Sequence, residues 1–182
     1  MGDKGVGEVE VRYRFSPNPS LLRKVSVHQD SNYKIHDVDL SFQLYVDTKS
    51  WPDWLRYSGP KVSAFYSHTS GNFRNNDSHR DQFGGNVGYR QRFWEVFFIE
   101  GNLGFSKSYN VLNFGGGTMP YRQESTNMHY DGSFGVELCF GSPICASVGF
   151  GYQGDHTIAG EPDYMSQGVF VTGAVAVQLP VP

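Results

Sequence analysis

The stretch that decides the fold is QFGGNVGYRQRFWEVFFIEGNLGFSKSY, residues 82–109. On either side of a break at residues 94–96, every second residue is predominantly large and apolar. The residues between them are glycine, polar or charged. A period of two over this length predicts a β-hairpin with one apolar face and one polar face.

The hairpin also predicts which polar side chains face each other. If Phe93 pairs with Phe97, then Arg90 lies directly opposite Glu100 on the polar face. Directly opposed residues of an antiparallel pair are close enough to interact, so we expect an ion pair between Arg90 and Glu100.

The same alternation recurs along the chain and predicts eight antiparallel strands in up-and-down order. They cover residues 8–16, 37–47, 61–69, 82–93, 97–109, 128–140, 146–153 and 169–179. No convincing helix lies between them. Residues 94–96 and 141–143 are tight turns, whereas four loops are expected to be long and to lie at one end: 17–36, 70–81, 110–127 and 154–166.

Composition excludes several classes of protein. A chain of 182 residues with 18% charged residues, 15% aromatic residues and 22 glycines fits one domain over residues 1–182, and is too apolar for disorder. A net charge of −3 gives no reason to expect nucleic-acid binding. No apolar run is long enough for a membrane-spanning helix. We expect no cofactor and no metal, because His28, His36, His79, His129 and His156 are scattered, mostly in predicted loops, without metal-ligand spacing.

The side chains on the two faces of the strands predict which face lines the barrel interior and which face points outward. The polar face carries small residues and charges of both signs on several strands, which suits the narrow interior of an eight-stranded barrel. The apolar face carries large aliphatic residues between two sets of aromatics. One set is Phe93, Trp94, Phe97, Phe140, Trp51 and Trp54; the other is Phe15, Tyr66, Phe83, Tyr109, Tyr130 and Tyr152. These patterns favour a transmembrane β-barrel with a plugged interior. The alternatives are a soluble β-sandwich and a soluble barrel that binds a small apolar ligand.

With these strands and turns, the whole chain resembles the small outer-membrane barrels of the OmpA/OmpX type. The resemblance implies a monomer in a bacterial outer membrane, with a removed signal peptide that Met1 replaces. It also implies a non-enzymatic surface or envelope role, with the four long loops contacting lipopolysaccharide or another surface partner. The chain ends at Pro182 and lacks the terminal aromatic residue that is usual in such barrels.

His68 and Ser70 support an enzymatic alternative. They share the outward face of one strand near the long-loop end, which resembles the His-x-Ser pair of outer-membrane lipid A deacylases of the PagL type. In that family the pair lies on a strand near the C-terminus and a glutamate supports the histidine. The late strand here lacks the pair, and the sequence alone assigns no carboxylate to His68. The resemblance implies lipid acyl hydrolysis at His68 and Ser70.

The two cysteines flank the turn at residues 141–143. Pairing Leu138 with Ala146 puts Cys139 opposite Cys145 on the polar face, at a separation that approaches disulfide range. The oxidising periplasm permits a disulfide at this position. Two unpaired thiols facing the interior remain the alternative.

Overall fold

The structure is a computed structural model that describes residues 5–17, 20–23, 32–47, 52, 57–73, 76–94, 96–112, 121–139, 143–160 and 164–180. Its strands are β1 (Gly5–Pro17), β2 (Ser20–Arg23), β3 (Asn32–Asp47), β4 (Tyr57–Phe73), β5 (Asn76–Phe93), β6 (Phe97–Leu112), β7 (Tyr121–Cys139), β8 (Ile144–Gly160) and β9 (Tyr164–Pro180). No helix among the described residues is long and apolar enough to cross a membrane.

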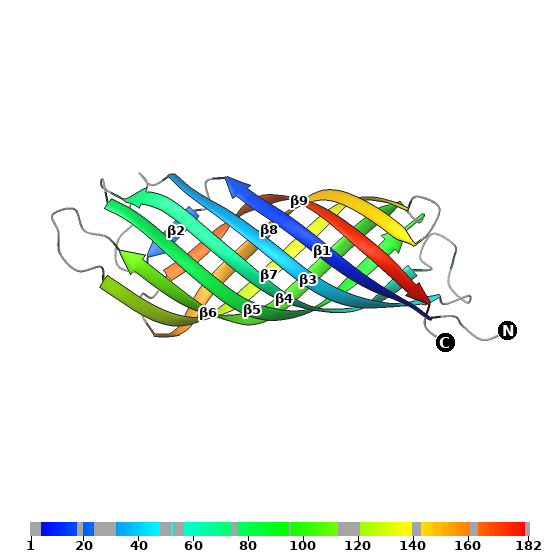
Figure 1. The fold of residues 1–182 in the computed structure, drawn as a ribbon, viewed down its shortest axis with the longest axis horizontal. Helices are drawn as coiled ribbons and strands as arrows, with labels where there is room; N and C mark the ends of the chain where they lie inside the picture. Colours follow the sequence, from blue (N-terminus) through cyan, green and yellow to red (C-terminus); the bar gives the residue numbers. More distant parts are fainter. Residues whose placement is uncertain are drawn as a thin grey trace.

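All strands except the short β2 form a closed antiparallel barrel, which confirms the predicted fold. From β3 to β9 each strand pairs with the next, and β1 closes the barrel by pairing with both β3 and β9. Figure 1 shows strongly tilted strands, with the start of β1 and the finish of β9 at one end. We call this end, which also holds the turn at 94–96, the turn end. Strand β2 pairs with the first residues of β9 and so continues the line of β1 toward the opposite end.

The apolar face of the wall points outward, as expected from the alternation. Outward-facing Leu40, Val87 and Ile99 are 57%, 64% and 56% exposed, whereas inward-facing Arg90 and Glu100 are 0% and 2% exposed. An apolar belt around a polar, charge-paired interior is the arrangement of a transmembrane barrel. The soluble sandwich and the soluble barrel with an apolar cavity are both wrong, because each would bury the apolar face.

Aromatic side chains border the apolar belt. Trp94 and Phe97 meet edge to face at the turn end, with ring centroids 6.3 Å apart. Toward the opposite end, Tyr66 and Phe83 lie on neighbouring strands with ring centroids 4.9 Å apart. Trp51, Trp54 and Phe140, expected in the same borders, lie outside the described residues.

The strands are longer than the sequence predicts, and the four expected loops are wrong in extent. Residues 32–36, 70–73, 76–81, 110–112, 121–127, 154–160 and 164–166 belong to strands, and part of 17–36 forms β2. Ladder hydrogen bonds do not require apolar side chains, so the sheet continues where the hydrophobic alternation has stopped. The barrel wall itself therefore extends beyond the apolar belt at the end opposite the turns.

Glycines on the two faces have different surroundings. A methyl group on inward-facing Gly151 would collide with the backbone carbonyl oxygen of Gly132 and would lie 2.7 Å from the ring of Phe170, so the close packing of the interior requires glycine there. On outward-facing Gly101 the nearest atom to such a methyl group would be 4.0 Å away. Close packing in the interior explains the first glycine and not the second.

Candidate functional site

The interior toward the turn end holds an ionic network that we call the lower charge cluster. Its members are Glu8, Glu10, Arg12, Lys61, Arg90, Arg92, Glu100 and Glu137. The structure places Arg90 opposite Glu100, with Arg90 Nε 2.8 Å from Glu100 Oε2. Arg12 contacts the same carboxylate through both terminal nitrogens at 2.7 Å, and Lys61 Nζ lies 3.0 Å from it. The predicted Arg90–Glu100 pair is thus one contact in a network that joins opposite sides of the barrel.

A second group of buried charges lies further from the turn end. Arg14 contacts Asp39 at 2.7 Å and Asp131 at 2.8 Å. His129 lies between two carboxylates: its Nε2 is 3.2 Å from Asp131 Oδ2 and its Nδ1 is 3.0 Å from Asp155 Oδ1. His129 lies in β7, in agreement with the predicted strand 128–140, whereas the expectation of loops is wrong for three other histidines, which lie in strands: His36, His79 and His156. His28 lies outside the described residues. These buried contacts fill the interior and hold the strands together.

The outward wall of β3, β4 and β5 carries a polar group beyond the aromatic border, which we call the outer patch. Its members are His36, His68, Ser70, His79 and Asp81. The Cα atoms of His36, His68 and Asp81 are cross-strand partners in one continuous row. The row on the membrane side contains Tyr66 and Phe83. The outer patch therefore lies where the lipid-facing wall meets the headgroup region.

Asp81 joins the outer patch to the aromatic border. His68 Nδ1 lies 2.8 Å from Asp81 Oδ1, and Tyr66 Oη donates to the same oxygen over 2.7 Å. A carboxylate bound to Nδ1 orients the imidazole and leaves Nε2 to face another group.

Ser70 lies on the same outward face as His68, two residues further along β4. Its Cα partner on β5 is His79, whose ring stacks toward that of His68 with centroids 6.4 Å apart. Among the described side chains no hydrogen bond joins Ser70 to His68. A carboxylate and an imidazole are therefore in contact across β4 and β5, and a serine hydroxyl lies on the same outward face without a contact to that imidazole.

Basic groups extend the outer patch along the wall. Lys34 is exposed and its Cα is the cross-strand partner of Ser70. Lys107, on β6, lies 3.1 Å from Glu124 with both side chains more than half exposed. Lys107 is the cross-strand partner of Phe83, so it belongs to the row of the aromatic border. The outward surface at and beyond this border therefore carries ammonium and imidazole groups together with the carboxylates of Asp81 and Glu124.

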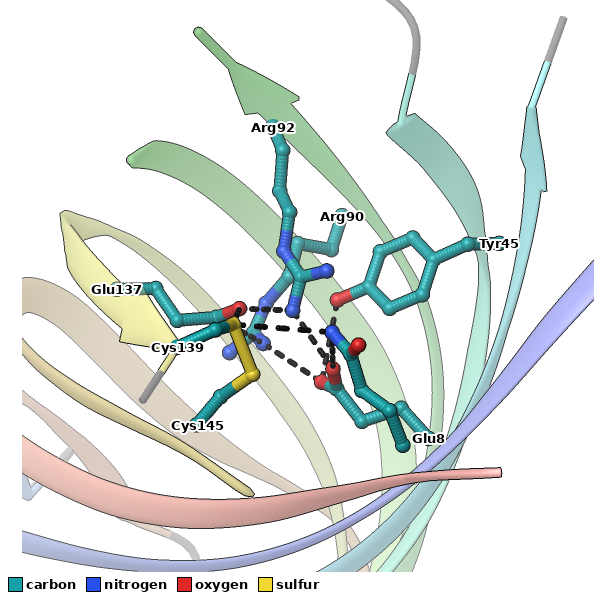
Figure 2. Close-up of a disulfide and its surroundings, with 8 residues drawn as sticks. Glu8, Tyr45, Arg90, Arg92, Glu137, Cys139 and Cys145 are labelled. Atoms are coloured by element: carbon teal, nitrogen blue, oxygen red, sulfur yellow. Dashed lines mark hydrogen bonds and ion pairs between the residues drawn. A yellow bond between two sulfur atoms is a disulfide. The ribbon is translucent and has the colours of Figure 1, made fainter. Parts of the chain in front are cut away.

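At the turn end the interior opens into a cavity of about 480 Å³. Its lining includes Tyr45, Arg92, Glu137, Cys139 and Gln178. The structure places Cys139 opposite Cys145 and joins them in a disulfide. Figure 2 shows the disulfide beside the carboxylate of Glu137 and the guanidinium of Arg92. This cavity, the lower charge cluster and the disulfide form one continuous polar region.

The fold and the two faces define a transmembrane β-barrel of the small outer-membrane type. The structure is similar to Ail, the attachment invasion locus protein of Yersinia pestis, solved in complex with the heparin analogue sucrose octasulfate, with a TM-score of 0.61. The identity is 11%, over 96% of this chain and 99% of that one. Neisserial surface protein A is similar with a TM-score of 0.53 and 9% identity, over 94% of this chain and 96% of the other. No protein-family model and no curated protein sequence matches the chain.

Sequence reasoning missed two components of these sites. The sequence pattern places Asp81 in the predicted loop 70–81, whereas it occupies a strand position thirteen residues after His68. The signal was present, because a tight turn near residues 74–75 would place the two residues opposite each other. The alternation of residues 8–16 places Arg12 on the polar face, but its contact with Glu100, 88 residues away, depends on the curvature of the closed barrel.

Proposed function

We propose that this barrel resides in a bacterial outer membrane and contacts phosphate-bearing groups of the outer leaflet through the outer patch. The observation that carries the proposal is the position of His36, His68, His79 and Lys34 immediately beyond the aromatic border. Lipopolysaccharide headgroups, which carry phosphates, lie at this depth. The role is one of surface contact, without catalysis.

The chemistry of the outer patch suits such a ligand. Ammonium and imidazole N–H groups donate hydrogen bonds to phosphate oxygens, and these bonds are strong when either partner is charged. The barrel wall extends beyond the apolar belt, so these donors stand on paired strands and are held in place before a ligand arrives. Ail was crystallised with a sulfated sugar, which gives a precedent for anionic ligands on this fold.

The test is binding of labelled lipopolysaccharide to the purified barrel in neutral detergent micelles. The variant replaces Lys34 and His79 with alanine, and Arg122→Ala is the matched control, because Arg122 occupies the same row on β7. Hydrogen bonds to charged groups are each worth about 1.5–3 kcal/mol, so we expect the double variant to lose about tenfold or more in affinity. Wild-type affinity in the double variant, or an equal loss in Arg122→Ala, would contradict the proposal.

A second candidate function is hydrolysis of an ester-linked acyl chain of a membrane lipid, and the Asp81–His68 hydrogen bond favours it. Ser70 Oγ would attack the ester carbonyl while His68 takes its proton, and Asp81 would hold the imidazole in place. The resulting acyl-enzyme would be cleaved by water, releasing the fatty acid and restoring the serine. The lipid's ester groups lie close to the aromatic border, next to the outer patch.

The two candidates are separable in one preparation. Release of fatty acid from lipopolysaccharide that disappears in Ser70→Ala and falls strongly in Asp81→Asn would establish the hydrolase. Surface contact predicts no release, with lipopolysaccharide affinity unchanged in Ser70→Ala. His36→Ala is the control for general effects of removing an outward imidazole, because His36 contacts Tyr13 and not Asp81.

A further inference from the structure

The disulfide at the turn end lies beside a third metal-ligating group. Cys139 and Cys145 face the interior from β7 and β8, and Glu137 precedes Cys139 on the same face of β7. The sulfur atoms and a carboxylate oxygen of Glu137 all lie within 4.8 Å of one another. Figure 2 shows the three side chains converging on one side of the interior. Two sulfurs and a carboxylate form a donor set suited to zinc and other thiophilic divalent cations.

The site is open to ions from the turn end. Cys139 is exposed and lines the cavity of about 480 Å³, whereas Cys145 is 1% exposed. Gln178 Nε2 lies 3.8 Å from Cys139 Sγ at the rim. The cavity thus offers a path for a cation and room for water as a further ligand.

We propose that reduction of the Cys139–Cys145 disulfide converts this corner into a site for a thiophilic divalent cation. A dithiol reductant supplies two electrons and two protons, is itself oxidised to a disulfide, and leaves two cysteine thiols. The cation then displaces both thiol protons and is held by two thiolates and the Glu137 carboxylate. Water from the cavity takes the fourth position, as in open three-ligand zinc sites.

The backbone geometry fits such a site without rearrangement of the strands. Zinc–sulfur bonds of about 2.3 Å at a tetrahedral centre place two sulfurs about 3.8 Å apart. The Cα atoms of Cys139 and Cys145 are 4.0 Å apart in the structure, so two thiolates on this pair can reach a shared ion. The required movement is confined to the sulfurs after the disulfide is broken.

Charge balance favours a divalent ion. The lower charge cluster holds four carboxylates and four basic groups, so its formal charge is zero. Two thiolates alone would add two negative charges to this buried region, which is costly. A divalent cation that enters as two protons leave restores neutrality. Monovalent cations would leave one charge uncompensated and are poor ligands for thiolate.

The experiment measures cadmium and zinc binding to the folded barrel in neutral detergent, before and after reduction by a dithiol that is then removed. We expect the reduced protein to bind one cadmium ion with a thiolate-to-metal absorption band, and the oxidised protein to show no band. Zinc should displace cadmium. Cys145→Ser should abolish the band, and Glu137→Gln should weaken binding about tenfold or more, as expected for losing one ligand.

Glu137 also contacts Arg90 and Arg92, so each variant is first checked for folding by gel mobility without boiling. If Glu137→Gln does not fold, two other variants decide the role of the sulfurs. Cys139→Ser removes one proposed ligand, and His156→Ala removes an imidazole of β8 that belongs to none of the proposed sites. The proposal requires loss of binding in the first and retention in the second. A folded, reduced wild-type barrel without a cadmium band overturns it, as does a band that persists without either cysteine.

Discussion

Replacing Glu100 with glutamine removes the central negative charge of the lower charge cluster while keeping the shape of the side chain. The Glu100 carboxylate is 2% exposed and accepts contacts from Arg12 at 2.7 Å, Arg90 at 2.8 Å and Lys61 at 3.0 Å. Glutamine keeps one oxygen acceptor but directs N–H donors at cations. Glu100→Gln therefore leaves buried positive charge without its anion.

The size of the effect follows from this burial. Removing one partner of a buried ion pair costs about 3–5 kcal/mol, because the remaining charge is left without compensation. Glu10 and Glu137 still neutralise part of the cluster, so the separate contacts should not add up. We expect Glu100→Gln to lower the free energy of unfolding by about 3–5 kcal/mol. Glu124→Gln, which breaks the exposed pair with Lys107, is the control and should not measurably shift unfolding.

The assay is reversible urea unfolding of the barrel in lipid vesicles, followed by tryptophan fluorescence and by gel mobility without boiling. Double-mutant cycles then divide the effect between partners. Arg12 makes two contacts with Glu100 at 2.7 Å and Arg90 makes one at 2.8 Å, so coupling with Arg12 should be the larger. A loss below about 1 kcal/mol, typical of surface pairs, would refute the claim that this network stabilises the fold.

The remaining predictions concern the wall, the packing and the disulfide. Ile99→Arg places a charge in the apolar belt and should destabilise the barrel by about 2–4 kcal/mol, measured as loss of folding into lipid vesicles. Normal folding of this variant would show that the assignment of the two faces is inverted. Gly151→Ala should destabilise by about 1–3 kcal/mol through contact with the neighbouring backbone and with an interior ring, whereas Gly101→Ala should be neutral in the same unfolding assay. Cys139 and Cys145 should resist alkylation in non-reduced, folded protein by mass spectrometry, and the pair should add little stability because the two cysteines are only six positions apart in the sequence.

The two faces and the hairpin register could be predicted because both depend on local alternation. Phe93 pairs with Phe97 and Arg90 with Glu100, as the period of two around residues 94–96 requires. A shift of the strand register by one residue would turn every apolar side chain inward. An alternation this long therefore leaves little freedom in the pairing register. The large side chains are outside and the charges inside because eight strands enclose a narrow space and the wall faces lipid.

The ends of the strands could not be predicted in the same way. Beyond the apolar belt both faces are polar, so residues such as His79 and Asp81 carry no alternation of hydrophobicity, and their serine, asparagine and aspartate neighbours are typical of turns. The members of the outer patch therefore fall partly in a predicted strand and partly in predicted loops. The ionic network could not be predicted from the sequence either. Its contacts across the interior depend on closure of the sheet into a barrel and not on pairing within one hairpin.

Strand β1 has a consequence for how the barrel is assembled. It contributes Glu8, Glu10, Arg12 and Arg14, all nearly fully buried, to partners on strands across the interior. A sheet of β3 to β9 without β1 would leave those partners uncompensated and two open edges without hydrogen bonds in lipid. Pairing of β1 with β9 satisfies the hydrogen bonds of the backbone and neutralises the buried charges at the same time. A barrel in which β1 is only partly paired is therefore unfavourable in lipid, because it leaves both backbone groups and buried charges unsatisfied.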